Sequence, residues 1–342
     1  MQSAAHQEKH FQQYIIDRLV EQGWKLGDSK FYDTERAVYP EDLESWIKTS
    51  GQQEKWDKLE RLNGAKTLEV LMDRLDKALE KQGTMQVLRQ GFSIAGCGLI
   101  EMTEAAPEDR RNEAVIKRYQ ANILRVVPEL KYHPAREFAI DLVLFINGLP
   151  VATVELKTDF TQSCEAAMDQ YRNDRLPYDA KTKRREPLLT FKRGAVVHFA
   201  MSDSEIMMAT KLDGENTFFL PFNKGRKDEN GTVHAGNPPG EIKADGTQEY
   251  PVAYFWEAVC QPDAWLRIFH SFVYVEKKDV VDIQGNWSKK ETLIFPRFHQ
   301  WTAVNQMLAD ARENGAGMTY LCDHSAGSGK TSTISWTAHD LV

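Results

Sequence analysis

The first part of the chain carries apolar residues at the spacing of amphipathic helices. Phe11, Ile15 and Leu19 recur every four positions, so one side of this segment is apolar and the other is polar. Helices are predicted over residues 8–24, 40–48 and 65–81. We expect these helices to be packing elements.

Runs of branched apolar residues follow, and they predict strands. The candidate strands are residues 122–127, 139–145, 150–156, 194–201 and 217–222. Asn147 and Gly148 form a turn signal between two of these runs, which predicts a β-hairpin. Residues 223–250 are dense in Gly, Asn, Pro and charge, and we expect them to form a long surface loop.

The C-terminal part of the chain returns to helical patterning. Residues 251–275 have a helical pattern, and residues 276–290 are polar enough to be a linker. The last segment predicts a helix over residues 300–313, a short apolar strand over 318–322, a glycine-rich turn and a helix over 332–338. This order of strand, turn and helix is typical of a phosphate-binding loop.

The composition is that of an ordinary globular protein. The 342 residues are 42% hydrophobic and 27% charged, and such a length suggests about two domains. No apolar run is long enough to span a membrane and the N-terminus has no apolar segment, so we expect a cytoplasmic protein without a membrane partner. The four cysteines are scattered without zinc spacing, and we expect reduced thiols. The net charge of -7 leaves room for a local basic face.

Three charged residues are predicted to converge at the open end of the hairpin. Asp141 begins one strand, and Glu155 and Lys157 end the other, so the two acids face each other to within about one residue. Two close carboxylates favour Mg²⁺, because a divalent ion neutralises their repulsion. A lysine beside them can position a water and stabilise charge on a phosphate, which indicates metal-assisted phosphodiester hydrolysis. The alternative is a charged hairpin end exposed to solvent.

The spacing alone is not specific, because an acid two positions before a lysine is common by chance. Residues 155–157 differ from other such triplets because they follow an apolar strand whose hairpin partner starts with an acid. Between Arg172 and Arg193 the chain also has eight basic residues against three acidic ones. This basic segment favours contact with nucleic-acid phosphates, and its alternative is a solvated surface loop.

A second candidate site lies near the C-terminus. Gly327, Ser328, Gly329, Lys330 and Thr331 form the core of a phosphate loop between a predicted strand and a predicted helix. The backbone N–H groups of such a loop hold phosphates, its lysine reaches the β- and γ-phosphates, and its threonine holds Mg²⁺. This motif predicts ATP binding.

Two further residues refine this second site. His324 stands where a general phosphate loop has its first glycine, which matches the helicase form of the loop better. Gln300 lies 30 residues before Lys330, where helicases often place a glutamine that reads adenine; its alternative is a helix-surface residue. Only 11 residues follow Thr331, too few for the second acidic motif that hydrolysis needs, so ATPase activity is not expected of this chain alone.

Together these motifs resemble the R subunit of type I restriction enzymes over nearly the whole chain. The motifs that share that family's order are residues 8–15, the hairpin 141–157, residues 219–225 and 235–239, Phe298 to Gln300, and the loop 324–331. The resemblance implies an α/β protein with a PD-(D/E)xK endonuclease core, in which helices flank a central mixed sheet, followed by the start of a RecA-like domain. We expect an endonuclease-like domain over residues 1–275, a linker over 276–290 and an incomplete RecA-like domain over 291–342, in a fragment of a larger motor nuclease.

The resemblance also implies roles for the hairpin residues. Asp141, Glu155 and the backbone carbonyl of Leu156 would bind Mg²⁺, and Lys157 would be the catalytic lysine. Gln170 matches the family's glutamine on the next helix only in part, because the tyrosine expected four positions later is absent there.

The acid that the family often carries on the first helix is replaced here by Gln12. Glu8 lies one turn earlier on the same side and could substitute for it. The alternative for Glu8 is an exposed acid near a helix N-terminus.

Two hypotheses about function follow. The first is a Mg²⁺-dependent endonuclease, part of a type I site-specific deoxyribonuclease that cuts double-stranded DNA and depends on ATP in the full-length protein. The resemblance implies the modification and specificity subunits as partners. The second is a non-catalytic DNA-binding or docking module of a helicase-type motor, in which the hairpin charges are structural.

Overall fold

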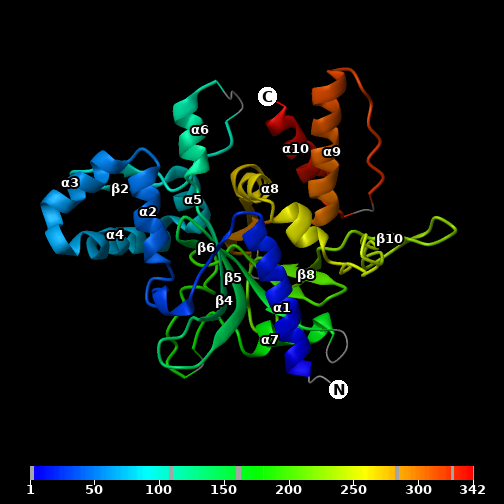
Figure 1. Ribbon diagram of the computed structural model, residues 1–342, viewed down its shortest axis with the longest axis horizontal. Helices are drawn as coiled ribbons and strands as arrows, with labels where there is room; N and C mark the ends of the chain where they lie inside the picture. The colour runs from blue at the N-terminus through cyan, green and yellow to red at the C-terminus, as the bar shows by residue number, and fades with distance from the viewer. Residues whose placement is uncertain are drawn as a thin grey trace.

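A mixed sheet of seven strands forms the centre of the computed structural model, which describes residues 4–107, 111–158, 163–179, 181–281, 285–324 and 327–341 (Figure 1). In spatial order the strands are β1 (Lys25–Leu26), β4 (Leu124–Lys131), β5 (Ala139–Ile146), β6 (Leu149–Leu156), β7 (Val197–Met201), β8 (Ile206–Ala209) and β9 (Leu220–Pro221). Two neighbouring pairs are parallel, β1 with β4 and β6 with β7, and the others are antiparallel. The expected mixed sheet is therefore confirmed, and β8 is a strand that the pattern did not indicate.

The predicted hairpin is the central pair β5–β6. Asn147 and Gly148 have φ angles of 48° and 86°, the two positive values that a tight turn between right-twisted strands requires. Gly148 also packs directly on the start of helix α2 (Pro40–Thr49), because a Cβ there would lie 2.7 Å from the carbonyl oxygen of Tyr39. All eight positions of β6 are buried, so this strand is covered on both faces.

Helices cover both faces of the sheet. The helices that precede residue 174 are α1 (Ala4–Glu21), α2 (Pro40–Thr49), α3 (Gln53–Asn63), α4 (Thr67–Gln82), α5 (Thr84–Gln90), α6 (Glu113–Gln120), which has no buried residue, and α7 (Cys164–Asn173). Phe11, Ile15 and Leu19 of α1 are buried in the larger apolar cluster, which also includes residues of α2 to α5. Helix α7 packs on the opposite face in a second cluster. The three predicted N-terminal helices are thus confirmed.

The segment expected to be helical over residues 251–275 consists of short helical pieces that complete the larger cluster. Helix α8 (Pro262–Arg267) lies between two π-helical turns, Phe255–Val259 and Ile268–Phe272. The rings of Phe199 and Phe255 are 5.0 Å apart, and the indole N–H of Trp24 donates to the carbonyl of Cys260 over 2.9 Å. The expected loop at 223–250 is mostly irregular and includes only the short pair β10 (Arg226–Lys227) and β11 (Val233–His234).

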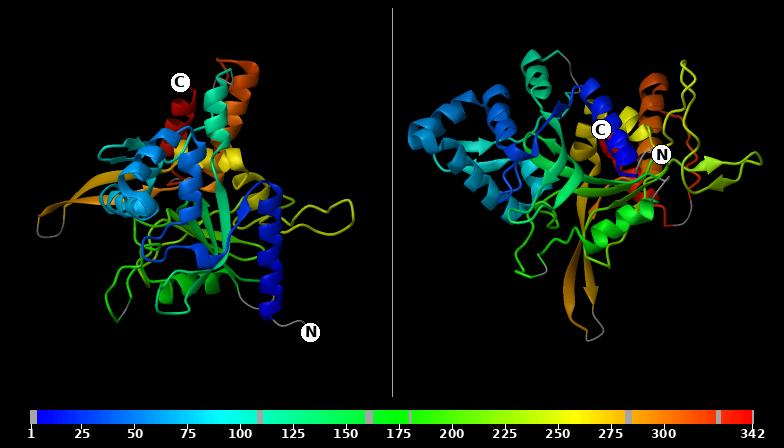
Figure 2. Two further views of the ribbon diagram at one scale, coloured as in Figure 1. Left: turned by 60° about the vertical axis from the view of Figure 1, so that its left-hand side comes forward. Right: turned by 60° about the horizontal axis from the view of Figure 1, so that its bottom comes forward.

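The residues expected to be a linker, 276–290, contain parts of two strands that the sequence pattern did not predict. Strands β12 (Tyr274–Val281) and β13 (Trp287–Ile294) pair antiparallel and form a hairpin that projects from the body of the molecule (Figure 2). Lys277 stands opposite Glu291 and forms an ion pair with it over 3.3 Å. Because most side chains of this arm are exposed, its strands lack the apolar alternation that marks a half-buried strand.

The C-terminal segment contains two packed helices, α9 (Phe298–Asn314) and α10 (Lys330–Asp340). The strand expected at 318–322 is wrong: these residues form no strand, and Leu321 is 94% exposed. A strand needs neighbouring strands for its backbone hydrogen bonds, and the described residues from 295 onward include none. A RecA-like sheet is therefore not shown. The remaining strands are β2 (Phe92–Ile94) and β3 (Gly98–Ile100), which pair with each other, and two short 3-10 helices are formed by Ser29–Phe31 and Gly64–Lys66.

Candidate functional site

Asp141 and Glu155 lie next to each other at the end of the central hairpin. The β5–β6 register pairs Leu142 with Val154, so the two acids occupy the next opposed positions. The carboxylate oxygen Oδ2 of Asp141 accepts a hydrogen bond of 2.6 Å from the backbone N–H of Leu156. The acid at the start of β5 therefore binds the end of β6 with its side chain.

The surroundings of Asp141 and Glu155 destabilise the negatively charged form of both carboxyl groups. Burial raises the pKa of Asp141, and the hydrogen bond from Leu156 and the charge of Lys157 oppose that rise. Burial also raises the pKa of Glu155 well above its usual range, and the negative charge of Asp141 adds to the effect. A cation bound between the two groups would relieve this cost.

Arg175 supplies one positive charge to this pair. Its Nε donates a 2.5 Å hydrogen bond to Oε1 of Glu155, and the salt bridge is almost completely buried. The other carboxylate oxygen of Glu155, Oε2, is buried and has no hydrogen-bond partner among the described residues. This pairing was not predicted from the sequence, because Arg175 lies in the basic segment that was expected to contact phosphates.

Lys157 lies in the same site. Its ammonium nitrogen is 2.9 Å from the carbonyl oxygen of Leu156 and 3.3 Å from Oε1 of Glu8. The structure thus brings the expected lysine, the expected carbonyl and the first-helix acid together. The Leu156 carbonyl accepts a hydrogen bond from this lysine here.

Gln12 connects the first helix to two neighbouring strands. Its Nε2 donates to the backbone carbonyl of Asp141 over 2.7 Å and to Oε1 of Glu129 over 3.3 Å. Glu129 stands opposite Asp141 in the β4–β5 pairing, between the pairs Pro128–Leu142 and Leu130–Ile140, and has a positive φ of 46°. Gln12 therefore occupies a position at the site, but it contributes an amide instead of an acid.

Gln170 opens onto a cleft beside Lys157. The cleft has a volume of about 390 Å³ and is lined by Lys157, Ala166, Asp169, Gln170, Asn173 and Asp174. The side-chain oxygen of Gln170 is buried without a hydrogen-bond partner among the described residues. Gln170 and Lys157 therefore share one polar cleft next to the buried acids.

The basic segment between Arg172 and Arg193 is largely neutralised within the chain. The ion pairs join Arg172 to Glu165 and Asp169, Arg175 to Glu155, Arg184 to Glu35, Arg185 to Glu80, Lys192 to Glu291, and Arg193 to Asp76 and Glu80. A count along the sequence misses these acids because most of them come from other elements. The segment therefore lends little support to phosphate binding.

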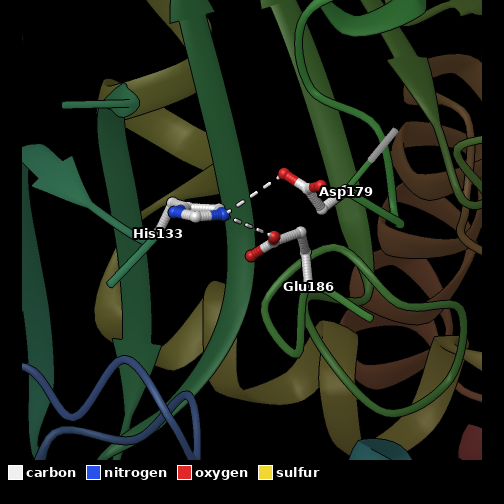
Figure 3. A group of neighbouring side chains, drawn as sticks. All are labelled: His133, Asp179 and Glu186. Carbon is white, nitrogen blue, oxygen red and sulfur yellow. Dashed lines mark ion pairs between the residues drawn. The ribbon is translucent and has the colours of Figure 1, made fainter. Parts of the chain in front are cut away.

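A second group of ionisable residues lies beyond the end of β4. Figure 3 shows His133 facing Asp179 and Glu186, and the three ligand atoms lie within 4.8 Å of one another. Nε2 of His133 is 3.5 Å from Oδ2 of Asp179 and 3.4 Å from Oε1 of Glu186. Burial raises the pKa of Glu186 to about 7. These residues could hold a metal ion, and the sequence analysis did not single them out.

The hydrogen bonds and ion pairs around His133 affect how well this group could bind a metal ion. Its Nδ1 accepts a 3.0 Å hydrogen bond from the backbone N–H of Ala135, so a neutral ring carries its proton on Nε2, toward the carboxylates. Oδ2 of Asp179 also pairs with Arg136 over 2.6 Å. A metal ion would have to displace the ring proton and compete with the guanidinium, so this group suits a cation less well than Asp141 and Glu155 do.

The described part of the phosphate loop contacts Gln300. Helix α10 begins at Lys330, after Gly329, whose φ is 81°. Nε2 of Gln300 donates to the carbonyl of Gly329 over 3.0 Å, and Nζ of Lys330 donates to the carbonyl of His324 over 2.7 Å. Residues 325–326 of the predicted loop lie outside the described residues.

The fold and this site define a class: a mixed α/β protein with paired acids and a lysine at the end of a central hairpin. The family model described as Type I restriction enzyme R protein N terminus matches residues 6–217, which is more than half of the chain. The protein belongs to this family, whose R subunits are nucleases. No curated protein matches the sequence. None of the helices in the described ranges is long and apolar enough to cross a bilayer.

Proposed function

We propose that this chain is a Mg²⁺-dependent endonuclease module of a type I restriction enzyme and cleaves phosphodiester bonds of double-stranded DNA. The convergence of Asp141, Glu155 and Lys157 at one hairpin end carries this proposal. Membership of the family implies DNA and the other subunits of a restriction complex as partners.

The residues present fit a divalent metal ion. Burial raises the pKa values of the two adjacent carboxyl groups, so a bound cation would be needed to hold both in their charged form, and Oε2 of Glu155 is a buried oxygen without a hydrogen bond among the described residues. Asp141, Glu155 and the carbonyl of Leu156 would hold Mg²⁺, which would supply Lewis-acid activation of the phosphate and of a water molecule.

Three side chains near the ion, those of Lys157, Glu8 and Gln170, would assist the reaction. Lys157 is the described cation nearest the open cleft, and its ammonium group can stabilise charge that develops on the phosphate. Glu8 holds that ammonium group from the side of α1. Gln170 can donate its amide N–H to a phosphate or to a water in the same cleft.

The proposal is tested in the assembled complex that contains the full-length R subunit. Asp141→Ala, Glu155→Ala and Lys157→Ala should each abolish DNA cleavage and leave ATP hydrolysis intact. Glu165→Ala on the exposed side of α7 is the matched control and should cleave normally. Cleavage that persists in all three site variants would contradict the proposal.

Titration of the 342-residue chain with Mn²⁺ distinguishes this function from the docking alternative. An endonuclease site should bind Mn²⁺ in a way that depends on Asp141 and Glu155. A docking module with structural charges should bind none at these residues.

We further propose that residues 327–331 are the phosphate-binding part of an ATP site and that residues 291–342 belong to a motor domain joined to an endonuclease-like domain over 1–275. The glycine turn at the start of α10 and its contact with Gln300 support this proposal. Lys330→Ala in the full-length R subunit should abolish ATP-dependent translocation and leave Mn²⁺ binding at the hairpin unchanged.

A further inference from the structure

The two oxygens of the Glu155 carboxylate have different surroundings. Oε1 accepts the 2.5 Å hydrogen bond from Nε of Arg175. Oε2 is buried and has no hydrogen-bond partner among the described residues. A buried carboxyl oxygen without a hydrogen bond is costly, so this atom is the one at which a divalent ion would bind.

Arg175 is held in place by the backbone at the end of α7. Its backbone N–H donates to the carbonyl of Gln170 over 3.1 Å, just after the last turn of the helix. The residue is 8% exposed and Glu155 is fully buried, so the pair is shielded from water. The salt bridge therefore links the helix that lines the cleft to the strand that carries the acid.

We propose that Arg175 is a positioning residue. It binds Oε1 of Glu155 and thereby leaves Oε2 as the single oxygen with which this glutamate binds the divalent ion. This inference rests on the proposed metal site. It adds the way in which Glu155 binds the ion and assigns a role to a residue that lies outside the expected motif.

An arginine suits this role better than a shorter or more mobile cation. The planar guanidinium has fixed N–H directions and binds one carboxylate oxygen while its charge stays with the pair. Without Arg175, Glu155 would lose its orientation next to Asp141. Removal of a residue that holds a metal ligand typically weakens metal binding by about 10–100-fold.

The first test is calorimetric titration of the 342-residue chain with Mn²⁺. Arg175→Met should weaken Mn²⁺ binding by about 10–100-fold, and Arg175→Lys should restore a large part of the loss. Arg172→Met is the matched control, because Arg172 pairs with the exposed acids Glu165 and Asp169 instead. The control should bind Mn²⁺ like the unchanged chain.

The second test is a crystal structure of the unchanged chain with Mn²⁺, which does not depend on the folding of a variant. We expect the ion on Oε2 alone, with Arg175 still on Oε1. Coordination through both oxygens, or an Arg175 that has left Glu155, would overturn the inference. So would unchanged Mn²⁺ affinity in a folded Arg175→Met variant.

These outcomes separate the inference from the function on which it rests. If the unchanged chain binds no Mn²⁺ at Asp141 and Glu155, the proposed function fails and the inference fails with it. If the unchanged chain binds Mn²⁺ through both Glu155 oxygens, the function stands and only the assignment of Arg175 is wrong.

Discussion

Glu8 and Lys157 are separated by 149 positions in the sequence, yet Nζ of Lys157 lies 3.3 Å from Oε1 of Glu8. The contact brings the first helix into the site at the end of the hairpin. It also gives the lysine a fixed neighbour from α1, so the ammonium group is held by the fold before a substrate arrives.

Glu8→Gln should reduce DNA cleavage by the complex by about 10-fold. The glutamine amide would still contact the ammonium group of Lys157, but it would no longer form an ion pair with it. Initial cleavage rates at saturating Mg²⁺ measure the effect. Glu21→Gln at the other end of α1 is the control, since Glu21 forms an exposed ion pair with Arg18. Equal rates for the Glu8 variant and the control would show that Glu8 is a surface residue.

Asp141→Asn and Asp141→Ala should differ in stability but agree in metal binding. The asparagine can still accept the hydrogen bond from the backbone N–H of Leu156, whereas the alanine leaves that group without its acceptor. We expect the alanine variant to be less stable than the asparagine variant by about 1 kcal/mol. Urea unfolding measures the difference, and Mn²⁺ titration should find no site in either variant.

Glu186 should make the stability of the protein depend on pH. Its folded-state pKa is raised to about 7 from an ordinary value of 4.5, so the folded state keeps a proton that the unfolded state releases. The free energy of unfolding should fall as pH rises between these two values, by at most about 3 kcal/mol, and level off above them.

Glu186→Gln carries no titrating proton at this position, so the fall should be smaller in the variant, to which only other groups with raised pKa values such as Asp141 and Glu155 still contribute. Urea unfolding at pH 5 and pH 7.5 compares the two proteins. The same pH dependence in both would show that Glu186 titrates normally. Mn²⁺ affinity at the hairpin should not change, whereas a loss of metal binding would point to the His133 group as the metal site.

Gly148→Ala should disturb the site from the far end of the hairpin. The residue has a φ of 86°, and a Cβ would lie 2.7 Å from the carbonyl oxygen of Tyr39. We expect a loss of at least about 2 kcal/mol of stability, since a strained φ and a backbone clash combine. Gly231→Ala is the control, because its φ is 80° and its surroundings are open. Thermal unfolding of both variants should show a clearly larger loss for Gly148→Ala.

The central hairpin could be predicted because its sequence signals are local. The two apolar runs and the turn at Asn147 and Gly148 predict the pairing of Asp141 and Glu155 only to within one residue, because a register shift between Leu144 and Phe145 moves Asp141 from Val154 to Glu155. The contact of Lys157 with the carbonyl of Leu156 also follows from short-range geometry. Most of the hairpin end could therefore be derived from a few neighbouring residues.

The contacts that could not be predicted from the sequence join elements that are distant along the chain. Arg175 was counted with the basic segment, and only the packing of α7 on the sheet turns it toward Glu155. The charge count also missed partner acids such as Glu80 and Glu291, which come from other parts of the chain. Strands β12 and β13 were missed because an exposed arm carries polar residues on both faces.

The aromatic core has a consequence for the order in which the protein can fold during synthesis. Phe11 of the first helix packs against Tyr250 and Trp256, with ring centroids 4.8 Å and 6.2 Å apart. A ribosome makes the first helix and the whole sheet before these partners exist. The nascent chain must therefore keep an apolar surface exposed until residues near 256 have emerged, so a chain ended at residue 217, where the family match stops, should aggregate instead of folding.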